Sequence, residues 1–96
     1  MSKEYEVVVV VEVENLEDKK VFDKYLKKEG LKEIEGEEFA YKGVSSTPLF
    51  HTRAFLEDTF KKALKKGKSF DSFKMIVQLG ENPLEVYKYN KERKSF

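Results

Sequence analysis

The chain of 96 residues is long enough for one small domain, and its 19 Lys and Arg against 18 Asp and Glu give a net charge of +1, which argues against a strongly basic nucleic-acid binder. The lack of cysteine excludes disulfides and cysteine zinc sites, and a single histidine excludes a multi-histidine metal site within one chain, so we expect no metal and no cofactor. No apolar run approaches the roughly 20 residues that span a bilayer, and the first residues lack a secretory pattern, so we expect a cytoplasmic protein without a membrane partner.

The first predicted element is a strand over residues 5–13, because the five consecutive valines from Val7 to Val11 are β-branched. Its odd-numbered side chains form one wholly apolar face. The other face is apolar only in its middle, at Val8 and Val10. This pattern is typical of a central strand whose second face is partly covered.

A helix is predicted over residues 16–29, with Asn15 as its N-cap and Gly30 just beyond its end. A short strand follows over residues 31–35, with a turn at Gly36-Glu37. The next strand covers residues 39–45, where the alternation places Phe39 and Tyr41 in the core.

The second helix is expected to begin at Thr47-Pro48, with threonine as N-cap and proline at the first helical position, and to end at Gly67. A long strand over residues 73–79 follows, and residues 84–89 are a candidate edge strand. Residues 90–96 show no pattern, which indicates a flexible tail. The order βαββαβ predicts an α+β, ferredoxin-like sandwich in one domain (1–96), in which two helices cover one face of a four-stranded antiparallel sheet.

The segment from Ser45 to Arg53 gathers hydroxyl groups, a histidine and an arginine at the start of the second helix. A helix N-terminus presents free N–H groups and a partial positive charge, which favour an anion. We therefore expect Ser46, Thr47, Thr52 and Arg53 as an anion site, with His51 as a weak catalytic candidate. An enzyme that acts on a small anionic substrate is one hypothesis, although the balance favours a protein without enzymatic activity.

The sheet face opposite the two helices would remain uncovered in a monomer. Exposed apolar patches usually mark contacts between proteins. The preferred hypothesis is therefore a binding or regulatory module that forms a homodimer through this face. The expected interface residues are Val8, Val10, Val44 and Ile76. Residues 1–38 carry 7 basic and 12 acidic side chains, whereas residues 39–96 carry 12 basic and 6 acidic ones, which also suits a protein partner of mixed charge.

A nucleic-acid-binding or nucleic-acid-processing protein is the alternative. Phe39-Ala40-Tyr41 resembles the aromatic–small–aromatic core of the RNA-recognition motif, a family with the same element order that stacks bases on exposed aromatic rings. Glu37 and Glu38 depart from that motif, which has a basic residue and a glycine there. Small ferredoxin-like proteins related to the CRISPR-adaptation nucleases and to toxin–antitoxin ribonucleases resemble this chain in size and layout. In this alternative, nucleic acid contacts Lys88, Lys91, Arg93 and Lys94.

Overall fold

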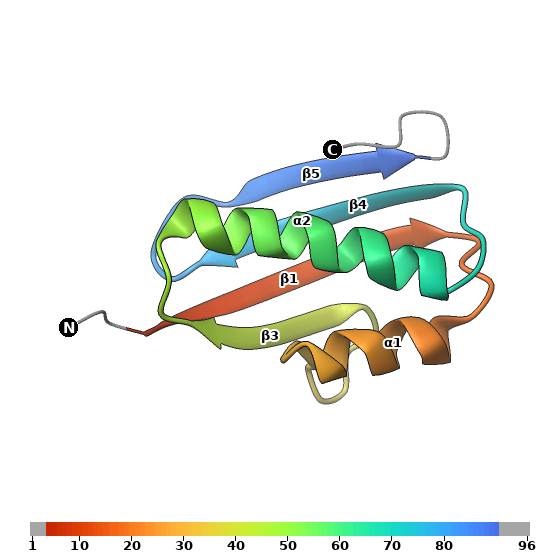
Figure 1. Cartoon of the computed structure of the whole chain (residues 1–96), viewed down its shortest axis with the longest axis horizontal. Helices are drawn as coiled ribbons and strands as arrows, with labels where there is room; N and C mark the ends of the chain where they lie inside the picture. The colour runs from red at the N-terminus through yellow and green to blue at the C-terminus, as the bar shows by residue number, and fades with distance from the viewer. Residues whose placement is uncertain (1–3, 91–96) are drawn as a thin grey trace.

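The computed structural model describes residues 4–90. Its elements in chain order are β1 (Tyr5–Glu14), α1 (Lys19–Lys28), β2 (Lys32–Glu33), β3 (Ala40–Ser45), α2 (Leu49–Lys66), β4 (Ser72–Leu79) and β5 (Glu85–Asn90). The five strands form one antiparallel sheet in the order β2-β3-β1-β4-β5, and both helices lie on the same face of it (Figure 1). The fold is therefore α+β, as the sequence predicts. Neither helix within residues 4–90 is both long and apolar enough to cross a membrane.

The sheet departs from the predicted four-stranded layout at its C-terminal edge. The expected edge strand is present as β5, which pairs antiparallel with β4 and makes the sheet five-stranded. Asn90, which the sequence pattern assigns to the tail, is the last residue of β5 and pairs with Ser72. The remainder of the predicted tail, residues 91–96, lies outside the described residues.

β1 lies at the centre of the sheet, with β3 on one side and β4 on the other. Val7, Val9 and Val11 are buried under the helices, whereas Val8 and Val10 point to the uncovered face. β4 shows the same alternation, with four buried side chains on the helix side. The core between sheet and helices includes an aromatic cluster of Phe22, Tyr41, Phe60 and Phe73, whose ring centroids lie 5.7 to 6.3 Å apart.

The start of the first helix differs from the prediction. Asp18, not Asn15, is the N-cap of α1, and its carboxylate accepts a hydrogen bond from the backbone N–H of Val21 at 3.2 Å. Asn15 instead has a positive φ of 55° and donates from its side-chain amide to Asp71 at 2.5 Å. Asparagine tolerates this backbone conformation better than most residues, so Asn15 turns the chain at the end of β1.

Two further local predictions are wrong. Phe39 is not in β3, because its φ of 58° places it in the left-handed region before the strand begins at Ala40. Thr47 does not cap α2. Pro48 occupies the N-cap position without a side-chain hydrogen bond, and the Thr47 hydroxyl contacts Ser45 and Thr52. The end of α2 at Gly67 agrees with the prediction.

Candidate functional site

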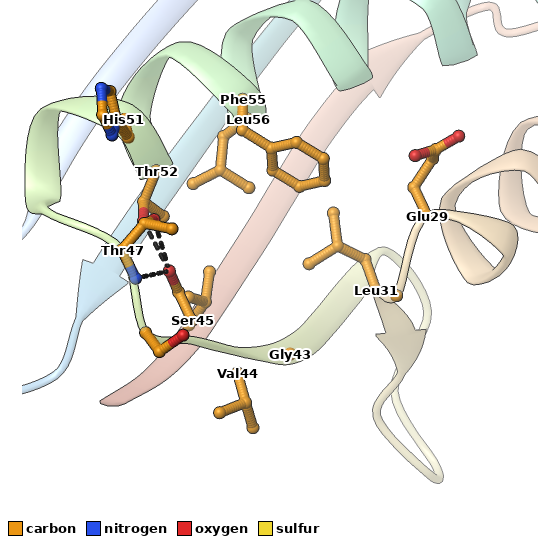
Figure 2. A pocket seen from close by; sticks show the side chains of 13 residues that line it. Glu29, Leu31, Gly43, Val44, Ser45, Thr47, His51, Thr52, Phe55 and Leu56 are labelled. Carbon is orange, nitrogen blue, oxygen red and sulfur yellow. Dashed lines mark hydrogen bonds between the residues drawn. The ribbon is translucent and has the colours of Figure 1, made fainter. Parts of the chain in front are cut away.

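The segment that joins β3 to α2 forms one side of a cavity of about 400 Å³ (Figure 2). The other side is formed by the C-terminal end of α1, where Gly30 has a φ of 97°. A Cβ atom at Gly43 would lie 2.9 Å from the carbonyl oxygen of Gly30, so the missing side chain lets β3 approach the end of α1 closely. The lining residues are Val7, Glu29, Gly30, Leu31, Gly43, Val44, Ser45, Ser46, Thr47, His51, Thr52, Phe55 and Leu56.

Three hydroxyl groups meet at one end of this cavity. The Thr52 oxygen lies 2.8 Å from that of Ser45 and 3.0 Å from that of Thr47, and the last two are 3.0 Å apart. The Tyr5 hydroxyl lies 2.5 Å from the Thr52 oxygen and donates to the backbone carbonyl of Thr47 at 2.7 Å. We name Tyr5, Ser45, Thr47 and Thr52 the hydroxyl cluster. Thr52 is only 4 % exposed, so these contacts satisfy a buried polar group.

The structure separates the predicted anion-site residues. Thr47 and Thr52 meet in the hydroxyl cluster, and Ser46 also lines the cavity. Arg53 does not line it. Its guanidinium makes a two-pronged ion pair with Glu85 of β5, at 2.7 and 2.8 Å. His51 lies at the rim, where it points away from the hydroxyl cluster in Figure 2 and its ring centroid is 4.1 Å from that of Phe50.

The pair between Arg53 and Glu85 ties α2 to β5. Hydrogen bonding with Arg53 lowers the pKa of the Glu85 carboxyl despite its partial burial. Burial and a hydrogen bond donated to Glu85 raise the pKa of Tyr87 to about 12. These three side chains therefore form a structural cluster of α2 and β5, and they are separate from the cavity.

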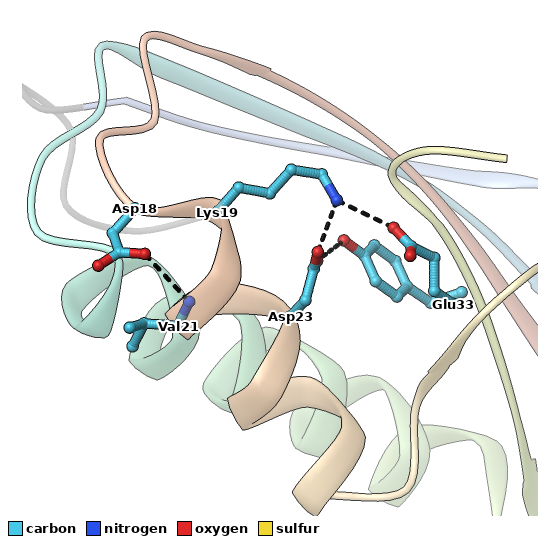
Figure 3. A network of polar contacts seen from close by, with 6 residues as sticks. Asp18, Lys19, Val21, Asp23 and Glu33 are labelled. Atoms are coloured by element: carbon cyan, nitrogen blue, oxygen red, sulfur yellow. Dashed lines mark hydrogen bonds and ion pairs between the residues drawn. The ribbon is translucent and has the colours of Figure 1, made fainter.

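A second polar network fixes α1 against the sheet (Figure 3). The ammonium group of Lys19 contacts Asp23 at 2.5 Å and Glu33 at 2.9 Å, and the Tyr41 hydroxyl donates to Asp23. Burial, followed by the hydrogen bond to Asp23, raises the pKa of Tyr41 above its ordinary value. Burial opposes the charge of Lys19, but its two carboxylate partners outweigh this effect and raise its pKa. Each of these groups is partnered, so we assign the network to stability.

The uncovered sheet face carries the four predicted interface residues. Val8, Val10 and Ile76 lie on the rows where β1 pairs with β3 and β4, and Val44 pairs with Glu6 at one end of the same face. Val10 is 43 % exposed and Val44 is 63 % exposed. The strand register also places Val86 of β5 on the uncovered face, because Val86 pairs with Ile76, and its side chain is 56 % exposed. Val86 is not among the predicted interface residues, because residues 84–89 are only a candidate edge strand in the sequence pattern.

The predicted nucleic-acid residues are described only in part. Lys88 lies in β5 and pairs with Lys74 of β4, so it shares the uncovered face. Lys91, Arg93 and Lys94 fall outside the described residues. Glu12 forms an ion pair with Lys74 at 3.0 Å, and Glu14 accepts a hydrogen bond from Ser72. Lys74 thus sits between an acidic and a basic side chain.

Several residues of the cavity and of the hydroxyl cluster beside it were not predicted, because they come from distant parts of the chain. Tyr5 precedes Thr52 by 47 residues, and Glu29 and Leu31 lie beyond the end of α1. Gly43, within a predicted strand, was the available signal, because glycine in a strand marks a close approach of backbone.

The chain matches no protein-family model, no curated protein and no solved structure. The cavity and the uncovered sheet face are therefore the two features that bear on its function.

Proposed function

We propose that this protein is a binding module of ferredoxin-like layout, extended by β5, that pairs with a second copy through its uncovered sheet face. The observation that carries this proposal is the central row of that face. Val10, Ile76 and Val86 are neighbours in register across β1, β4 and β5, and none of them is covered by a helix. Removal of such a row from water is the main source of association energy between proteins.

The charges beside the row favour a second copy of the same chain. Glu12 and Lys74 are opposite each other on β1 and β4, one step along the strands from Val10 and Ile76. A twofold axis that runs along the strands, between β1 and β4, lays β1 of one copy over β4 of the other. Val10 then faces Ile76 of the second copy, and Glu12 faces its Lys74. Both the apolar and the charged positions are thus self-complementary.

The substitution Val10→Glu tests this interface. A carboxylate in the centre of a face-to-face contact loses water without gaining a partner, so the dimer dissociation constant should rise by about a hundredfold or more. Sedimentation equilibrium measures this change, and circular dichroism verifies that the variant stays folded. The matched control is Val21→Glu, because Val21 is 37 % exposed but lies on α1, across the sheet from the proposed interface.

The charged pair gives a second, independent measurement. Lys74→Glu should weaken the dimer, and the swapped double variant Glu12→Lys with Lys74→Glu should restore it, because the exchange preserves each opposite-charge contact. A wild-type chain that remains monomeric at high concentration contradicts the proposal. A Val21→Glu variant that dissociates as much as Val10→Glu would move the interface to the helix side.

A further inference from the structure

We infer that the cavity between α1 and the hydroxyl cluster binds a small organic cation, an ammonium group carried on an apolar body. The cavity lies on the helix side of the sheet except at Val44, which also belongs to the uncovered face, and the residues that carry this inference are not those that carry the proposed dimer. Its volume of about 400 Å³ is in the range of sites for small molecules. Four features of its lining bear on the chemistry of the ligand.

The first feature is the direction of the hydrogen bonds in the hydroxyl cluster. Tyr5 donates its single hydroxyl proton to the carbonyl oxygen of Thr47, which can only accept. Thr52 must therefore donate to Tyr5, since these two oxygens are 2.5 Å apart. Ser45 and Thr47 lie within hydrogen-bond distance of each other and of Thr52, so both can donate inside this triangle. The cluster can therefore use all of its hydroxyl protons internally.

The capacity that remains in the cluster is for accepting hydrogen bonds. Ser45 accepts one bond from the backbone N–H of Thr47 at 3.2 Å and has a further lone pair, and the Thr47 oxygen also has lone pairs to spare. Both residues line the cavity. A ligand that donates, such as an ammonium group, can bind here without disturbing the cluster. A carboxylate or phosphate would bind the cluster only if Ser45 or Thr47 turned its hydroxyl proton toward the cavity and gave up a hydrogen bond inside the cluster.

The second feature is charge. Glu29 lines the cavity, whereas no lysine or arginine among residues 4–90 does, although Arg53 is close in sequence. Figure 2 shows Glu29 and the hydroxyl cluster on opposite sides, with Leu31 and Phe55 between them. The carboxylate therefore supplies a negative charge that a cation in the cavity would neutralise.

The third feature is the C-terminal end of α1, because Glu29 and Gly30, the two residues that follow the helix, border the cavity. A helix C-terminus carries a partial negative charge from its carbonyl groups. The N-terminus of α2 has the opposite sign and also borders the cavity, through His51 and Thr52 of its first turn, so the carboxylate of Glu29 rather than the helix ends favours a cation. The fourth feature is the apolar wall of Val7, Leu31, Phe55 and Leu56, which favours an apolar body on the ligand.

Three probes with one phenyl ring and different end groups test this inference: 2-phenylethylamine, 2-phenylethanol and 3-phenylpropionate. Amide resonances of the ¹⁵N-labelled chain report where each probe binds. The amine should shift Gly30, Gly43 and Thr47 in a saturable manner, and it should bind at least about fivefold more tightly than the alcohol. The carboxylate and inorganic phosphate should leave these resonances in place.

Variants then locate the ammonium group. Thr47→Val removes the acceptor and keeps the shape, and it should weaken the amine about fivefold or more. Glu29→Gln should weaken it about threefold, because the carboxylate acts across a partly exposed cavity. Glu35→Gln is the matched control, since Glu35 is exposed and does not line the cavity. Ser45→Ala is the second test of the cluster if Thr47→Val unfolds.

Two results would overturn the inference. One is the absence of saturable shifts at Gly30, Gly43 and Thr47 with the amine. The other is carboxylate or phosphate binding there as tightly as the amine, which would establish an anion site at the start of α2. Because the dimer is measured with the Val10→Glu variant, failure of either proposal is distinguishable from failure of the other.

Discussion

The side chain of Glu85 determines the role of Arg53, although the two residues are far apart in the sequence. From the sequence, Arg53 is expected to help hold an anion at the start of α2. In the fold, Glu85 lies 32 residues further on and takes both prongs of the guanidinium. A donor that is occupied in this way contributes to the joint between α2 and β5 rather than to a site.

The lowered pKa of Glu85 gives a prediction for acid stability. A carboxyl group whose pKa falls on folding stabilises the fold above its ordinary pKa of 4.5, and this contribution is lost as the pH falls through the lower folded-state value. The free energy of unfolding of the wild type should therefore exceed that of Glu85→Gln by a constant amount at neutral pH. The difference should shrink below pH 4.5.

Urea denaturation at a series of pH values measures this difference. Glu81→Gln is the control, because Glu81 is exposed and forms no ion pair among the described residues. A difference between wild type and Glu85→Gln that does not change from neutral to acid pH would show that the pair with Arg53 does not form in solution.

At the scale of elements, hydrophobic alternation predicted the strands and helices in their correct order. It succeeded for β1 and β4 because both strands bury one face under the helices. It failed at boundaries that tertiary contacts decide. Asparagine is favoured at N-caps, but the side chain of Asn15 donates a hydrogen bond to Asp71, which is 56 residues away. This contact fixes the turn instead.

The cap of α1 can be tested directly. Asp18→Ala removes the acceptor for the Val21 N–H and should lower the free energy of unfolding by about 1 kcal/mol. Chemical denaturation followed by circular dichroism measures this loss. Lys20→Ala, at an exposed position in the first turn of α1, should change stability by no more than about 0.5 kcal/mol. Equal effects of the two substitutions would contradict the role of Asp18.

At the scale of the whole molecule, the sequence predicted two layers with one uncovered face. It predicted four strands in the sheet, whereas the sheet has five. β5 is short and follows a turn that contains Pro83, so periodicity alone gave it little weight. Its contribution comes from packing, because Tyr87 and Tyr89 lie against the core and Tyr89 stacks on Phe70 with centroids 5.7 Å apart. The cavity was equally hidden, since it needs β1, β3 and both helices at once.

Truncation after Pro83 should show that β5 is part of the cooperative fold. The shortened chain loses two partly buried tyrosine rings, each worth roughly 1.5 to 3 kcal/mol, and leaves Arg53 without Glu85. The expected loss is at least about 3 kcal/mol, a large share of the roughly 5 to 15 kcal/mol of a small domain. The reference is a chain that ends at Asn90, and urea denaturation compares the two. Equal urea midpoints of the two chains would show that β5 does not contribute to the stability of the fold.

The hydroxyl cluster has a consequence for how selectivity is encoded. Tyr5 does not line the cavity, yet its bond to the Thr47 carbonyl leaves Thr52 as the donor in the contact between the Tyr5 and Thr52 hydroxyls. Gly80 leaves room for Tyr5, because a Cβ atom added at Gly80 would lie only 3.2 Å from the Tyr5 Cβ. The hydroxyl of Thr52, which lines the cavity, is therefore oriented by Tyr5, and the position of Tyr5 depends on the turn at Gly80. Substitutions at Tyr5 or Gly80 can therefore change which ligands the cavity selects, although neither residue lines it.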